Sequence, residues 1–235
     1  MIANDRASDL PLSAVLRFSM VQIMGNSHKT RVYLIRHGAT LQSEEDRFTG
    51  SADVELDDEG RRQAKLLGAR LAAAKLEAVY CSDMKRAMAT AEAVALPHGL
   101  APTAVAQLRE IDHGHWEGLL HSEVAEKYAD EYEAWKADPL MSAPTGGETA
   151  WAVLSRAAPA FLKIVRDHPG GKIAVVSHKA TNRLLIAFVL GMDLARYRDR
   201  LAQDPACMNV IEFVPPAEAK AIALNDTNHY QTLPG

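Results

Sequence analysis

Short apolar runs alternate along the chain with segments in which apolar residues recur every three or four positions. The first run, 32–35, is bounded by polar residues and then by Gly38, which predicts a buried strand. The segment 57–74 begins with acidic residues and continues with apolar residues at helical spacing, which predicts a helix. The same alternation predicts further strands at 78–81, 103–108 and 173–176, a helix from a Ser82 N-cap to about 96, and a helix that ends at Leu190.

This order of elements predicts the fold class. Strands that alternate with helices indicate an α/β three-layer sandwich, because parallel neighbours need crossover connections and helices must cover both faces of the sheet. Two last β-rich stretches, 209–214 and 219–224, flank a pair of prolines and predict a hairpin at an edge of the sheet. We therefore expect a mostly parallel central sheet with helices on both faces.

The remaining segments set the domain organisation. No linker rich in Pro, Gly or Ser interrupts the chain, and no internal repeat is present, so we expect a single domain over 30–235 after an N-terminal tail, 1–29. Within it, 119–146 is a helical insertion with apolar and aromatic positions at helical spacing, and we expect it to act as a small lid. The longest apolar stretches fall far short of the ~20 residues that span a bilayer, so we expect no membrane partner.

Composition and charge narrow the function further. The 235 residues include 26 Lys and Arg against 30 Asp and Glu, a formal charge of −4, which argues against a general nucleic-acid or anionic-membrane binder. The two cysteines, Cys81 and Cys207, are too few for a disulfide framework and form no C-x-x-C pair. We expect a cytoplasmic protein. Because the overall charge is negative, any site for an anion must come from a local group of residues.

Ionisable residues follow each predicted strand of the parallel sheet. In open α/β sheets the ligands bind outside the carboxyl ends of the strands, so these residues are expected to share one edge. Guanidinium groups match phosphate oxygens in bidentate fashion, a neutral imidazole can attack phosphorus, and a carboxylic acid can protonate the departing oxygen. The pattern predicts phosphoryl transfer at Arg36, His37, Arg86, Glu110 and His178.

The motifs around these residues resemble the histidine phosphatase superfamily, in its phosphoglycerate mutase-like branch 1. The resemblance covers about 30–229 and is carried by Leu34-Ile35-Arg36-His37-Gly38-Ala39-Thr40, Phe48-Thr49-Gly50, Ser82-Asp83-Met84-Lys85-Arg86-Ala87, Leu108-Arg109-Glu110, Gly146-Gly147-Glu148-Thr149 and Val176-Ser177-His178.

The resemblance implies a role for each group. It makes His37 the residue that is phosphorylated, Glu110 the proton donor, and Arg36, Arg86 and His178 the phosphoryl ligands, without any metal or cofactor. Where many family members carry Trp-Asn after the first histidine and Gly after the second, this chain has Gln42-Ser43 and Lys179. The further substrate-binding candidates are Ser43, Thr49, Gly50, His113 and Lys179.

Several functions are compatible with these residues and motifs. From Leu119 to Gly146 there are six acidic residues against two lysines, a balance of −4, so we expect an acidic lid that disfavours a second anionic group. This favours a phosphatase of small metabolites, similar in character to phosphoserine phosphatases, over a 2,3-bisphosphoglycerate-dependent phosphoglycerate mutase. The alternatives from other classes are a non-catalytic phospho-ligand binding module and a metal-dependent hydrolase built on the His113-x-His115 pair. The sequence is also compatible with a homodimer.

Overall fold

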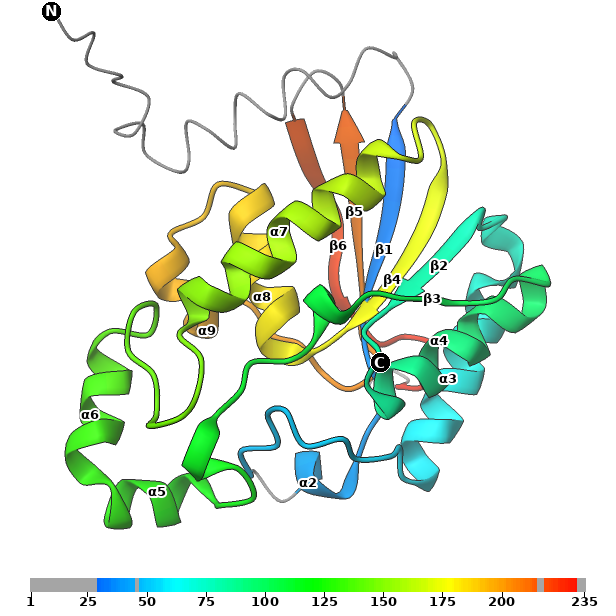
Figure 1. Ribbon diagram of the computed structural model, residues 1–235. Helices are drawn as coiled ribbons and strands as arrows, with labels where there is room; N and C mark the ends of the chain where they lie inside the picture. The colour runs from blue at the N-terminus through cyan, green and yellow to red at the C-terminus, as the bar shows by residue number, and fades with distance from the viewer. Residues whose placement is uncertain (1–28, 45–46, 215–217, 232–235) are drawn as a thin grey trace, which may run out of the picture.

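A computed structural model describes residues 29–44, 47–214 and 218–231, so that all of the expected N-terminal tail except Lys29 lies outside the described residues (Figure 1). Its helices and strands alternate along the chain. They are β1 (Thr30–Arg36), α2 (Leu41–Glu44), α3 (Asp58–Leu71), β2 (Ala78–Cys81), α4 (Lys85–Ala95), β3 (Thr103–Ala104), α5 (His121–Lys127), α6 (Ala129–Ala137), α7 (Ala150–Arg166), β4 (Lys172–Ser177), α8 (Lys179–Val189), α9 (Tyr197–Arg200), β5 (Met208–Val214) and β6 (Glu218–Asp226).

The strands form one six-stranded sheet in the order β3-β2-β4-β1-β5-β6. The first four of these strands run parallel, whereas β5 pairs antiparallel with both β1 and β6. The mixed α/β class with a mostly parallel sheet is therefore confirmed, as is the hairpin at its edge. Because β1 lies inside the sheet, its carboxyl end is flanked by the end of β4 on one side.

The two faces of the sheet bury alternate residues of β1. Val32 and Leu34 pack with residues of α7 and α8, whereas Tyr33 and Ile35 pack with residues of α3 and α4. This is the alternation expected of a strand that is buried on both faces. Figure 1 shows α3 and α4 on one side of the sheet and α7 and α8 on the other, so the helices cover both faces.

Two details of the expected elements are wrong. The helix expected from a Ser82 N-cap begins at Lys85, with Met84 in the N-cap position, while the Ser82 hydroxyl accepts a bond of 3.3 Å from the Met84 N–H. The strand expected at 103–108 ends after two residues, because the chain turns into a 3₁₀ helix at Ala106–Leu108 that buries the Leu108 side chain. Edge strands of this kind tolerate early termination, since only one side is paired.

The longest helix, α7, was not among the expected elements. Thr149 caps it by accepting a bond of 3.0 Å from the Ala152 N–H, and its apolar residues recur at three- and four-residue spacing. The helix covers the sheet with residues such as Val153, Ala157 and Phe161. Pro159 lies inside it, which disfavours a helix by propensity and is outweighed here by the burial of one whole face.

The expected helical insertion consists of α5 and α6. Val124 and Trp135 are buried in a cluster with Phe48 and Trp116, and Tyr128 and Tyr132 pack against it. The aromatic residues thus attach the insertion to the body of the protein. Among residues 29–44, 47–214 and 218–231, no helix combines the length and apolar character that a membrane crossing requires.

Candidate active site

His37 directly follows β1 and is held in one tautomer. Its Nδ1–H donates to the Gly38 carbonyl at 2.7 Å, and its Nε2 accepts a bond of 3.2 Å from the Arg86 Nε–H. Gly38 has no room for a side chain, since a Cβ there would lie 2.5 Å from the Gly60 carbonyl oxygen. Both contacts leave the lone pair on Nε2, which is the nitrogen that faces Arg86.

The surroundings of His37 keep its ring neutral. Burial lowers its pKa well below the usual 6.5, and the positive charges of Arg86 and Arg36 lower it further. Only the neutral imidazole has a nucleophilic nitrogen. The site therefore holds His37 in the form that can attack phosphorus at neutral pH.

Two buried guanidinium groups flank this ring. Arg86, in the first turn of α4, donates to the carbonyls of Ala52 at 2.6 Å and Gly50 at 2.9 Å. Arg36 ends β1 and donates to the Gln203 carbonyl at 2.6 Å, while its buried Nε–H has no partner in the described part of the chain. The backbone bonds fix both planes, and an unpaired buried donor of this kind is stabilised by an anionic acceptor.

His178 follows β4, the strand that pairs with β1. Its ring centre lies 5.2 Å from that of His37, and the residue is fully buried. Neither of its ring nitrogens has a hydrogen-bond partner among the described residues, and burial lowers its pKa well below 6.5. An unsatisfied buried polar group costs roughly 1–3 kcal/mol, which a phosphoryl oxygen bound between the two rings would offset.

Glu110 reaches the same cavity although the strand that was expected to carry it ends earlier. Its Oε2 accepts a bond of 3.0 Å from the Ala180 N–H, and its Oε1 accepts from the N–H groups of Thr181 at 3.2 Å and Ile111 at 3.0 Å. The carboxyl group is therefore held against the first turn of α8, which begins directly after His178. These contacts place the carboxyl group of Glu110 on the wall of the cavity that Arg36, His37 and Arg86 also line.

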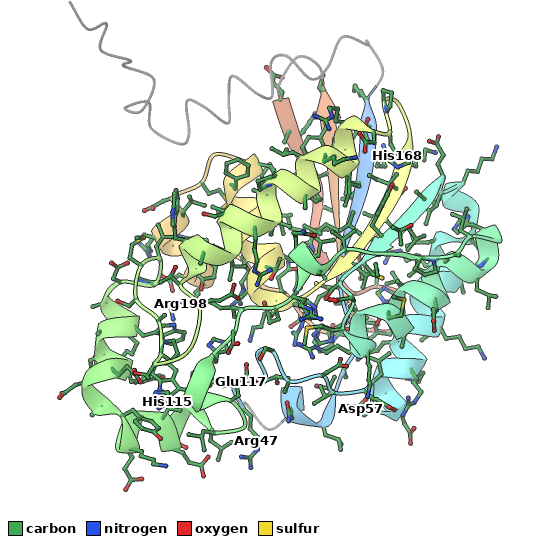
Figure 2. The ribbon with its side chains drawn as sticks, in the orientation of Figure 1. Arg47, Asp57, His115, Glu117, His168 and Arg198 are labelled. Atoms are coloured by element: carbon green, nitrogen blue, oxygen red, sulfur yellow. The ribbon has the colours of Figure 1, made fainter. Side chains whose placement is uncertain are left out.

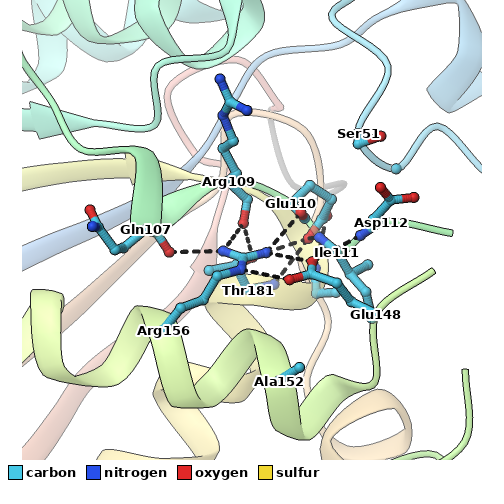
Figure 3. Close-up of polar contacts among 12 residues, drawn as sticks. Ser51, Gln107, Arg109, Glu110, Ile111, Asp112, Glu148, Ala152, Arg156 and Thr181 are labelled. Carbon is cyan, nitrogen blue, oxygen red and sulfur yellow. Dashed lines mark hydrogen bonds and ion pairs between the residues drawn. The ribbon is translucent and has the colours of Figure 1, made fainter. Parts of the chain in front are cut away.

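An arginine that the sequence analysis did not select holds the segment that carries Glu110. Arg156, on α7, donates to the carbonyls of Arg109 at 2.9 Å and Glu110 at 3.0 Å (Figure 3). It also pairs with both carboxylate oxygens of Glu148, at 2.9 and 2.8 Å, and Glu148 accepts a bond of 3.1 Å from the Asp112 N–H. We call these contacts of Arg156 the clamp. The sequence signal that could have identified it was the motif Gly146-Gly147-Glu148-Thr149, which contains Glu148.

Four of the five further substrate-binding candidates line the cavity: Thr49, Gly50, His113 and Lys179. Gly50 adopts a left-handed conformation with φ of 49°, and its carbonyl binds Arg86 as described above. Burial lowers the pKa of His113 to about 4, so its ring is neutral at pH 7. The side chain of the fifth candidate, Ser43, lies outside the described residues.

The outer wall of the cavity corrects the expectation of an acidic lid. The cavity has a volume of about 450 Å³, and we call the part of its lining that carries Arg47, Lys179, Arg183 and Arg198 the outer wall. Of these four residues, Arg47 and Arg198 are labelled in Figure 2. The insertion contributes Trp135 and His121 to the lining, but none of its acidic residues. Among those acidic side chains, Glu131 pairs with His115 at 2.6 Å, and Glu123 lies 3.8 Å from Arg47, one of the cations of the outer wall. The charge balance of a segment does not reveal which of its side chains face the site.

The His113-x-His115 pair does not converge on a metal site. His113 lines the cavity, whereas His115 contacts Glu131 and packs at a tilt against Tyr128, with their ring centres 4.3 Å apart. Within the described part of the chain, no group of three or more His, Cys, Asp or Glu side chains is arranged to hold a metal ion. Both cysteines are buried, and burial raises the pKa of each thiol to about 12.

Comparisons with known proteins agree with this geometry. The chain is 32% identical over 167 residues to phosphoserine phosphatase 1 of Hydrogenobacter thermophilus, covering 71% of this chain and 79% of that protein. It is 31% identical over 183 residues to the adenosylcobalamin/alpha-ribazole phosphatase of Escherichia coli, covering 77% and 89%. The solved structure of Bacillus stearothermophilus YhfR superimposes with a TM-score of 0.80 at 31% identity, covering 86% of this chain and all of that one.

The family model described as histidine phosphatase superfamily (branch 1) matches residues 32–227. This range contains the strand ends, the helices that position them and the insertion over the outer wall. The resemblance noted in the sequence is thereby confirmed. The chain belongs to the histidine phosphatase superfamily, branch 1.

Proposed function

We propose that the protein is a metal-independent phosphomonoesterase that hydrolyses a small phosphorylated metabolite through a phosphohistidine at His37. The observation that carries this proposal is the arrangement of His37, whose Nδ1–H is tied to the Gly38 carbonyl while Nε2 faces Arg86. The named activities of the relatives, which include a phosphoserine phosphatase and an alpha-ribazole phosphatase, support hydrolysis of this substrate class.

The first step forms a bond between His37 Nε2 and phosphorus as the bond from phosphorus to the ester oxygen breaks. Arg36, Arg86 and His178 donate to the phosphoryl oxygens and stabilise the charge that spreads over them. Glu110, protonated at this stage, gives its proton to the departing alkoxide, which leaves as the alcohol. The enzyme then carries an N–P bond on His37 and an ionised carboxylate on Glu110.

The second step returns the enzyme to its starting state. Glu110 removes a proton from a water molecule, whose oxygen attacks phosphorus as the N–P bond breaks. Inorganic phosphate leaves, His37 is again neutral and Glu110 again carries a proton. The proposed cycle consumes one ester and one water and needs no group beyond the side chains of the cavity.

The test is a screen of phosphorylated metabolites in the presence of a chelator, followed by rapid quench with a ³²P-labelled substrate. The proposal requires chelator-resistant release of phosphate and acid-labile label that maps to His37. Activity that the chelator abolishes would contradict metal independence. Binding without turnover and without label would instead favour the non-catalytic phospho-ligand module.

A mutase is the second candidate, and the cationic outer wall of the cavity is the observation that favours it. A mutase must hold a second negatively charged group, and Arg183 and Arg198 offer such contacts. Incubation with 3-phosphoglycerate separates the two functions, because a mutase produces 2-phosphoglycerate and a phosphatase produces glycerate and phosphate. We expect phosphate release to dominate, whereas isomerisation at the faster rate would assign the mutase.

A further inference from the structure

Arg198 is held at the outer wall of the cavity by the insertion. Its guanidinium carbon lies 3.7 Å from the centre of the Trp135 ring, and its Nη2–H donates to the Trp135 carbonyl at 2.8 Å. Figure 2 shows Arg198 at the side of the molecule where α9 approaches α6. The stacking and the backbone bond fix the guanidinium plane, and the other N–H groups of Arg198 make no hydrogen bond to the residues that the structure describes.

Arg183 lies on α8, in the helix that begins beside His178. Its Nε–H donates to the Leu201 carbonyl at 2.6 Å, which leaves its two terminal nitrogens for the cavity that it lines. Within residues 29–44, 47–214 and 218–231, neither Arg183 nor Arg198 has an acidic side chain within 4.0 Å. Two partly buried cations on one wall thus have backbone partners but no ion pair in this part of the chain, although the charges of Glu110 and Asp199 act on Arg183 and Arg198 respectively from a longer distance.

The charges of the wall are close enough to affect each other and the phosphoryl end. Burial lowers the pKa of Arg183, its interactions with Tyr197, Glu110 and Cys207 raise it, and the neighbouring charge of Arg198 lowers it by a smaller amount. The charge of Arg183 in turn contributes to lowering the pKa of Arg36, after the larger effect of burial. Arg183 therefore interacts electrostatically with both Arg36 and Arg198 in a cavity that Glu110 and Asp204 also line, and an anion bound between Arg183 and Arg198 would be attracted by both.

We infer that Arg183 and Arg198 form a subsite for a carboxylate carried by the phosphomonoester, at a distance from its phosphoryl group. This inference rests on the proposed function, since it assigns the part of the substrate that remains outside the reacting centre. A guanidinium presents paired N–H groups that match a carboxylate, and both side chains are oriented by one backbone bond each. The cavity volume of about 450 Å³ suits a compact metabolite.

The test uses two substrates that differ only in the carboxylate. Phosphoserine and phosphoethanolamine share the phosphoryl group, the ester oxygen and the amine, and 3-phosphoglycerate and glycerol 3-phosphate form a second such pair. We expect kcat/KM of the wild-type protein to be at least about tenfold higher for the carboxylate member of a pair, the amount that one or two charged hydrogen bonds supply. In Arg198→Met and in Arg183→Met this ratio is expected to fall to near one.

The matched control is Arg200→Met, an exposed arginine of the same helix as Arg198 that does not line the cavity. It should keep the wild-type ratio. Because the ratio compares two substrates on one preparation, any loss of folded protein in a variant cancels. Equal losses on both members of a pair would mean that Arg198 only supports the fold, and would overturn the subsite.

Other outcomes separate this inference from the proposed function. Hydrolysis of both members at equal rates by the wild-type protein would overturn the subsite and leave the phosphatase intact. No hydrolysis of any of the four compounds and no acid-labile label would contradict the phosphatase and the subsite together. A preference for 2,3-bisphosphoglycerate that Arg198→Met removes, without a carboxylate preference in the pairs, would assign a second phosphate and overturn the carboxylate.

Discussion

The inner end and the outer wall of the cavity are built in different ways. At the inner end, Arg36 is the last residue of β1, His37 and His178 directly follow β1 and its neighbour β4, and Arg86 lies in the first turn of the helix after a third strand. The outer wall comes partly from connecting segments, with Arg198 on α9 and Trp135 on the insertion, and partly from α8, which carries Arg183.

The difference in construction suggests that the inner end and the outer wall have different roles. Strand ends are fixed by the register of the whole sheet, so the residues that follow them keep a defined geometry. Connecting segments can change in length and composition without disturbing that register. We therefore expect substitutions at the inner end to remove turnover of every substrate, and substitutions at the outer wall to change the choice among substrates.

The largest expected effect is at His37. His37→Ala removes the nitrogen that forms the N–P bond in the proposed mechanism, so kcat/KM should fall by at least about 10³-fold on all phosphomonoesters, and the acid-labile label should vanish. His98→Ala, a histidine that does not line the cavity, should retain wild-type turnover and labelling. Turnover of His37→Ala at the wild-type rate would overturn the phosphohistidine mechanism.

The next effect concerns the proton donor. Glu110→Gln keeps the shape of the side chain but removes the transferable proton, so kcat on alkyl phosphates should fall by about 10²- to 10⁴-fold. Aryl phosphates, whose departing oxygen needs little protonation, should lose much less. The control is Asp112→Asn, two residues away. If Glu110→Gln lowered both substrate classes equally, and Asp112→Asn discriminated between them, Asp112 would be the acid.

A smaller loss is expected when the support of Glu110 is removed. Arg156→Met breaks the bonds to the carbonyls of Arg109 and Glu110 and the pair with Glu148, which frees the segment that carries the acid. We expect kcat on alkyl phosphates to fall by about tenfold, with a smaller loss on aryl phosphates, because misplacement of a catalytic group slows the step that uses it. Arg166→Met, an exposed arginine on the same helix, is the matched control.

A loss in Arg156→Met that is equal on alkyl and aryl phosphates would assign Arg156 a purely structural role. Thermal unfolding of both variants shows whether stability accounts for the change. If Arg156→Met melted at the temperature of Arg166→Met but still discriminated against alkyl phosphates, the effect would belong to the position of Glu110.

The inner end could be predicted from the sequence because its residues follow strands that the hydrophobic pattern identifies. Arg36, His37 and His178 required only that the runs at 32–35 and 173–176 be strands of one parallel sheet. Glu110 was placed correctly although the strand before it was drawn too long, since its position depends on the bonds to α8.

The outer wall could not be predicted in the same way. The charge of the insertion was counted without knowledge of which side its acidic residues face, and they do not line the cavity. Arg198 and Trp135 are 63 positions apart along the chain, and no local pattern pairs them. The clamp between Arg156 and the segment 107–110 likewise depends on α7, a helix whose apolar spacing was present in the sequence but was not used.

The smallest expected effect is on the pH dependence of the free energy of unfolding, to which His113 and the inner histidines contribute separately. Burial lowers the pKa of His113, on the wall beyond the phosphoryl ligands, to about 4 from 6.5, so below pH 6.5 the unfolded chain binds a proton that the folded chain does not. The free energy of unfolding contributed by this group is therefore present above pH 6.5 and is lost as the pH falls toward 4. In His113→Asn the decrease in the free energy of unfolding between pH 7 and pH 5, measured by denaturant unfolding, should be about 1 to 2 kcal/mol smaller than in the wild-type protein.

The decrease in the free energy of unfolding that remains in His113→Asn belongs to other groups, among them the inner pair His37 and His178, whose pKa values are also lowered. An unchanged pH dependence in His113→Asn would show that the outer histidine is as accessible to protons in the folded chain as in the unfolded one.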